Sequence, residues 1–149
     1  MENASKALIM AAGILIGVLI LSLATYLIVD FGSTSAQIHK QNEEKQITEF
    51  NSQFTAYEGY KNKDGNWQIT IYDIITLAGY AKENNEYYKD VEEEQIKVIV
   101  NNIQIQDNKD EYSLIKKYVD SNGTLKKFKC DSITYNGRGK VNLISFRQL

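Results

Sequence analysis

Proline is absent from this chain, and cysteine and histidine each occur once, as Cys130 and His39. Without proline, nothing forces a kink in a long helix, and a wall-sorting signal of the L-P-x-T-G type is excluded. One cysteine excludes an internal disulfide and a cluster of thiolate metal ligands. Neither a disulfide framework nor a cysteine-based metal centre is therefore expected.

Catalytic chemistry has little support in the sequence. His39 has no second histidine or cysteine near it, so a solvated surface residue is the default interpretation, and Cys130 alternates with Phe128 as a small buried strand residue does. The one cluster of carboxylates, Glu92, Glu93 and Glu94, is expected in a solvated loop before a strand. The net charge of −2 provides no field that attracts nucleic acid. We expect no enzyme activity, no cofactor, no metal and no nucleic-acid partner.

The chain does contain one long apolar run. Residues 7–29 are 23 residues without a charge, bounded by Lys6 and Asp30. A bilayer core needs about 20 apolar helical residues, so this run can span it. A cleaved signal, with Thr34-Ser35-Ala36 as its cleavage site, and a buried core helix are the alternatives. We expect a retained transmembrane anchor over residues 1–30.

The few charges beside the run suggest its orientation. Lys6 and the α-amine precede it, and the positive-inside bias then keeps the N-terminus cytoplasmic and the rest of the chain extracytoplasmic. The run also contains Ala12, Gly13, Gly17 and Ala24, with the two glycines in G-x-x-x-G spacing. Small residues favour close helix packing, although glycine is also common in membrane helices generally.

The polar segment 31–57 retains a helical pattern. Ile47, Phe50, Phe54 and Tyr57 lie at i, i+3, i+7 and i+10, which places them on one helical face. The sequence therefore predicts an amphipathic stalk, forming either one long helix with the anchor or a second helix nearly collinear with it.

Residues 58–149 predict a globular head. Thr70 and Asp73 form a capping box that begins a helix, with Asn84-Asn85 as its stop and a buried face of Ile71, Ile74, Ile75, Ala78 and Ala81. From residue 96 the apolar period becomes two, with Asn101-Asn102 as either a hairpin turn or a bulge.

The rest of the head contains a short helix and a hairpin. A helix over 110–120 is expected to bury Tyr112, Ile115 and Val119, and Asn136-Gly137-Arg138-Gly139 turns a closing hairpin. The sum is an α+β fold: a long N-terminal helix, then a small antiparallel sheet with helices packed on it.

Opposite charges are segregated in the head. Residues 83–94 carry six acidic side chains against one lysine, and residues 125–149 carry six basic side chains against one aspartate. Such patches can meet within a subunit or between subunits, where they set register more than affinity. The candidate inter-subunit residues are Glu92, Glu93, Glu94, Lys126, Lys127, Lys129, Arg138 and Lys140.

The layout resembles the type IV pilin-like superfamily, with Ala7–Val29 as the apolar half of the helix and Ile38, Ile47, Phe50 and Phe54 in its amphipathic half. The resemblance implies a subunit that is anchored in the membrane and then packs its helix with those of other copies in a bacterial surface filament or secretion pseudopilus. The alternative is a single-pass, membrane-tethered accessory or binding module of an envelope complex.

Overall fold

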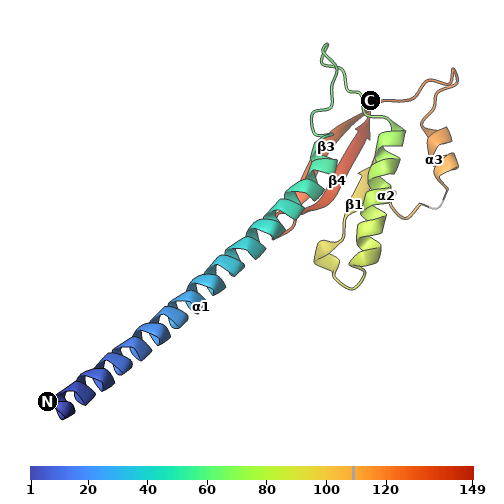
Figure 1. Cartoon of the computed structure of the whole chain (residues 1–149). Helices are drawn as coiled ribbons and strands as arrows, with labels where there is room; N and C mark the ends of the chain where they lie inside the picture. The colour runs from blue at the N-terminus through green and yellow to red at the C-terminus, as the bar shows by residue number, and fades with distance from the viewer. Residues whose placement is uncertain (109) are drawn as a thin grey trace. The chain divides into compact units, whose positions relative to one another are not determined.

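The computed structural model describes residues 1–108 and 110–149, and it divides into two compact units, Met1–Lys45 and Gln46–Leu149. Helix α1 (Glu2–Thr55) begins in the first unit and ends in the second without interruption (Figure 1). Gly32 therefore does not break the helix, and of the two predicted arrangements the single long helix is observed. We call residues 46–149 the head.

The apolar part of α1 buries nothing within the chain. Its most apolar 18-residue window has a mean hydropathy of 2.7 and is 0% buried, which makes α1 a candidate membrane span by length and composition. The hydroxyls of Ser22 and Thr25 each donate to the carbonyl four residues earlier, at 2.8 Å. These polar groups are thus satisfied by their own helix, as an apolar environment requires.

A four-stranded sheet in the order β2-β1-β4-β3 forms the head. Its strands are β1 (Lys97–Val100), β2 (Ile103–Gln104), β3 (Phe128–Tyr135) and β4 (Val141–Gln148). The α+β class is confirmed. The sheet is mixed rather than wholly antiparallel, because β4 enters between β1 and β3 and pairs parallel with β1, with Val98 opposite Ile144.

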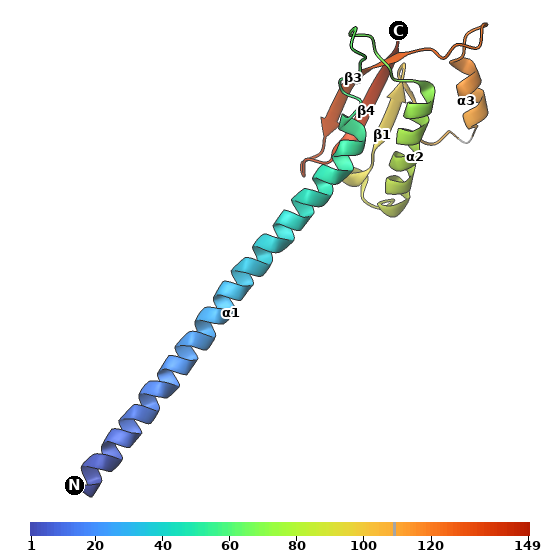
Figure 2. The same cartoon turned by 45° about the horizontal axis from the view of Figure 1, so that its top comes forward.

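Helix α2 (Ile71–Tyr87) packs along β1 (Figure 2). The predicted capping box is present: the Asp73 carboxylate accepts hydrogen bonds of 2.8 Å from the backbone N–H and the hydroxyl of Thr70. The predicted stop at Asn84-Asn85 is wrong, since the helix continues to Tyr87. The predicted face is buried apart from Ile75, which is half-buried, and it also includes Leu77 and Asn84.

Of the two arrangements predicted at Asn101-Asn102, the hairpin is observed. Both residues have positive φ, 48° and 67°, which a two-residue type I′ turn requires and asparagine tolerates. Val100 pairs with Ile103 across it.

The remaining helices are short. The 3₁₀ turn η1 (Glu92–Glu94) follows α2, and α3 (Glu111–Lys117) is capped by the Asp110 carboxylate, which accepts from the Ser113 backbone N–H at 3.0 Å. The predicted face of α3 is partly wrong. Tyr112 is 75% exposed, and Leu114 packs against the core beside Ile115 instead.

One apolar core lies on one face of the sheet, between it and the helical segments. Inward residues of β1 and β4 alternate with outward ones, and α2 covers them together with residues 46–55 of α1. Phe54 is fully buried in this core, and Phe50 and Tyr57 pack against it. Phe50, Phe54 and Tyr57, which the sequence places on the apolar face of a stalk, therefore belong to the core of the head.

We predict that Phe54→Ala destabilises the head by about 3–5 kcal/mol, because it leaves a cavity in a closed core. Phe31→Ala is the matched control in the same helix, since Phe31 is 77% exposed. Denaturant unfolding of the full chain in micelles, followed by fluorescence of Trp67, the one tryptophan, measures both. Equal midpoints for the two variants would contradict the packing described.

Candidate functional site

A lysine is buried where four elements of the head meet. Lys140, between the β3–β4 turn and β4, is 7% exposed, and its Nζ donates to Asn84 Oδ1 at 2.7 Å and to Glu94 Oε2 at 3.1 Å. Asn84 belongs to α2 and Glu94 to η1. Phe50 of α1 and Tyr88, just after α2, present their rings to the ammonium, with centroids 4.8 and 4.3 Å away.

The orientation of the Asn84 amide is fixed by its partners. Its Nδ2 donates to the backbone carbonyl of Glu94 at 2.7 Å, and its Oδ1 accepts from Lys140. A carbonyl can only accept and an ammonium can only donate, so the reversed amide would lose both bonds. Asn84 is 8% exposed. The carbonyl carbon of Asn84 is therefore held beside the lysine nitrogen.

Glu94 is the acid of this site, and its predicted place in a solvated loop is wrong. It is 6% exposed, and Oε1 accepts from Arg138 Nη1 at 3.0 Å. Burial by itself raises the pKa of Glu94, but the hydrogen bond from Lys140 and the charges of Lys140 and Arg138 outweigh it, so the pKa lies below its usual value. Glu94, Arg138 and Lys140 pair within one head, which replaces the inter-subunit interpretation for these three.

A hollow of about 370 Å³ borders the site, between the end of α1 and α2. Its walls come from the end of α1, from α2 and from Tyr88, and it is lined by Phe50, Gln53, Tyr80, Glu83, Asn84, Tyr87 and Tyr88. Asn84 thus contacts the buried lysine and also lines the hollow.

A second asparagine joins α1 to the same hairpin. Asn51 Nδ2 donates to the Gly139 carbonyl at 2.7 Å, and its Oδ1 accepts from the Val141 backbone N–H at 2.8 Å. Asn51 thus bonds to the residues immediately before and after Lys140. Sequence analysis missed Asn51, because a polar residue beside an apolar stripe gives no sign of a partner 88 residues away.

The other predicted charge-patch residues lie apart from this site. Lys129 pairs with Asp131 at 3.0 Å, and Lys127 Nζ donates to the Gln68 carbonyl at 3.3 Å. Lys126 is half-buried beside α3, and its backbone N–H donates to Tyr118. Glu92 and Glu93 are exposed, so an inter-subunit role for those two stays a prediction.

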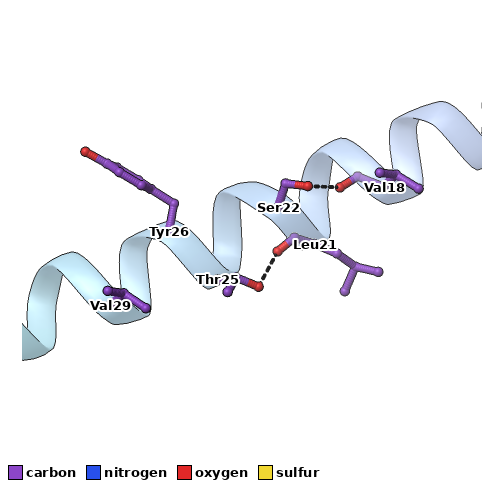
Figure 3. Close-up of a pocket in the computed structure, with 6 residues that line it drawn as sticks. All are labelled: Val18, Leu21, Ser22, Thr25, Tyr26 and Val29. Atoms are coloured by element: carbon purple, nitrogen blue, oxygen red, sulfur yellow. Dashed lines mark hydrogen bonds between the residues drawn. The ribbon is translucent and has the colours of Figure 1, made fainter.

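The predicted packing residues of the span lie on open surface. Ala12, Gly13 and Ala24 are exposed, Gly17 is half-exposed, and a Cβ added at either glycine would meet nothing within 4 Å. Figure 3 shows a shallow hollow on the same segment, in which Tyr26 and Leu21 extend from the helix to different sides. All six residues that line it come from α1 alone, so it is helix surface and no enclosed site.

The two residues considered for catalysis have ordinary surroundings. His39 is exposed, and among residues 1–108 and 110–149 no three histidine, cysteine or acidic side chains gather as metal ligands. Cys130 is half-buried against the core, and burial, with the nearby carboxylates of Glu58 and Asp131, raises its pKa to about 11.

No protein-family model, curated protein or solved structure matches this chain.

We predict that Asn51→Ala lowers the free energy of unfolding of the head by about 1–3 kcal/mol, because the buried Val141 N–H loses its acceptor. Ser52→Ala is the neighbouring control, since the Ser52 hydroxyl donates only to Glu49 of its own helix. Denaturant unfolding measures both, and an unchanged midpoint for Asn51→Ala would refute the role assigned to this amide.

We predict that Cys130 is alkylated slowly by iodoacetamide at neutral pH. A pKa of about 11 in place of an ordinary value lowers the thiolate fraction by roughly a hundredfold in the folded chain. The rate should rise with pH up to about 11, and denaturant should restore ordinary reactivity. Equal rates in the folded and denatured chain at neutral pH would show that the thiol is not protected.

Proposed function

We propose that this chain is a structural subunit, pilin-like in architecture, that is anchored in a membrane by α1 and assembles through α1 into a bacterial surface filament or secretion pseudopilus. The observation that carries the proposal is the exposure of the apolar half of the 54-residue helix α1, whose most apolar window is 0% buried, in a chain whose head encloses a core of its own.

The exposed run requires an apolar environment. Each Leu, Ile or Val left in water forgoes about 1.5–3 kcal/mol of burial, and large apolar residues follow one another along residues 8–29. Lipid supplies that environment before assembly, and the helices of other copies supply it afterwards. The proposed orientation places the N-terminus in the cytoplasm and the head outside it, as the charge bias around the span favours.

Cohesion between subunits is then expected from α1 rather than from the head charges. Glu94, Arg138 and Lys140 are already paired within the head, and so are Lys129 and Asp131. In contrast, Gly13, Gly17 and Ala24 fall on one side of the helix at four- and seven-residue spacing, and nothing in the chain touches the glycines. This face lets another helix approach closely.

We predict that Gly13→Leu and Gly17→Leu each abolish assembly while the head stays folded. A Cβ added at either glycine meets nothing within 4 Å, so with the head still folded a loss of assembly reports contacts between chains. Ala11→Leu is the matched control, because Ala11 lies about 160° around the helix from Gly13. Assembly of both glycine variants as efficiently as the control would contradict packing through this face.

The proposed function is tested by a tag at the exposed C-terminal Leu149, gentle shearing of cells, and immunogold electron microscopy of the released material. Labelled filaments in the sheared fraction are expected. Label confined to membranes would overturn the filament proposal and leave the single-pass, membrane-tethered accessory module.

A further inference from the structure

The buried lysine of the head has a reactive partner as well as a counter-ion. Lys140 carries a primary amine, Asn84 carries a carboxamide, and Glu94 can accept and return a proton; all three are less than a tenth exposed. An amine held against an amide can displace ammonia from it. We propose that Lys140 and Asn84 become joined by an intramolecular isopeptide bond, formed when Lys140 Nζ attacks Asn84 Cγ and ammonia leaves.

The reacting atoms already lie close together. Lys140 Nζ is 2.7 Å from Asn84 Oδ1, and Cγ lies one bond beyond that oxygen. Reacting atoms in near-attack geometries are about 3–3.5 Å apart, so the amine has to leave its hydrogen bond with Oδ1 and move over the face of the amide to reach Cγ. Both side chains are fixed, the amide by its two partners and the amine by Glu94 and two rings. Such fixed placement removes most of the entropic cost of the encounter.

Glu94 balances the protons of the reaction. Its Oε2, 3.1 Å from Nζ, takes one proton from the ammonium and so frees the lone pair that attacks Cγ. The tetrahedral intermediate gives up a second proton from Nζ as the C–N bond to Nδ2 breaks, and Nδ2 receives both protons. An ammonium and a carboxamide thus become a secondary amide and an ammonium ion, with no oxidant, reductant or other reactant.

The charged pair is the starting state of the reaction. The hydrogen bond from Lys140 and the charges of Lys140 and Arg138 hold the pKa of Glu94 below its usual value, so Glu94 takes the proton only as Nζ begins to bond to Cγ. The rings of Phe50 and Tyr88 lie against the ammonium and limit its movement. Asn84 Nδ2 contacts the carbonyl of Glu94 and Asn85 Oδ1, acceptors that hold the leaving nitrogen.

The bond would cross-link the head covalently, which an internal disulfide cannot do because the chain has one cysteine. It would tie α2 to the start of β4 across 56 residues, at the point where α1 also docks through Asn51. Constraining the unfolded chain in this way stabilises a fold as a disulfide does, and the link resists reduction.

The test is the intact mass of the purified full chain in micelles, followed by peptide mapping. We expect a mass lower than that of the sequence by one ammonia molecule, and a branched peptide joining Lys140 to Asn84. Exposed Asn122-Gly123 and the turn at Asn136-Gly137 can also lose ammonia by forming a succinimide. Hydroxylamine cleaves a succinimide and leaves an isopeptide bond intact, so it separates the two.

Variants assign the roles. Lys140→Arg keeps the charge but removes the nucleophile, since a guanidinium stays protonated, and should show the full mass. Glu94→Gln should also show the full mass, whereas Glu93→Gln, at the exposed neighbour, should lose ammonia as the parent chain does. A parent chain of full mass with no branched peptide after prolonged incubation overturns the proposal, and this outcome needs no variant to fold. Equal ammonia loss in Glu94→Gln and Glu93→Gln overturns the role of Glu94.

Discussion

An ammonium group taken out of water must be compensated, and the head is arranged around that requirement. Lys140 receives an amide oxygen, a carboxylate and two aromatic faces from α1, α2, η1 and the residue after α2. Removing the carboxylate of Glu94 would leave a buried charge without its counter-ion, which is far more costly than the loss of an ordinary contact. The position of each element therefore depends on the others through this one nitrogen.

The compact head and the apolar half of α1 obey different physical constraints. The head satisfies every described buried side-chain polar atom internally and encloses its own core. The apolar half of α1 satisfies its backbone and hydroxyl groups internally too, yet leaves its hydrocarbon surface uncovered. A segment with that combination suits lipid or neighbouring helices, which is the basis for proposing an anchored, assembling subunit.

Local patterns predicted most of the fold. The capping box at Thr70 and Asp73, the alternation around Val98 and the Asn101-Asn102 turn act over a few residues, so sequence reveals them. The Lys140 site was missed because its bonds are long-range. Asn84 was interpreted as a helix stop, whereas its partners lie 10 and 56 residues away and keep it within the helix. Glu94, Arg138 and Lys140 were recognised as opposite charges, but composition cannot tell pairing within a head from pairing between heads.

Residues 46–55 of α1 and the elements around Lys140 are expected to open as one cooperative unit. Native-state amide hydrogen exchange of the full chain in micelles tests it most directly, because residues that open together share one opening free energy. The account predicts that the slowest amides of 46–55, of α2 near Asn84 and of β4 near Val141 exchange with the same opening free energy and denaturant dependence. If the amides of residues 46–55 instead exchange by fraying, with a lower opening free energy than those of α2 and β4, the segments do not form one cooperative unit.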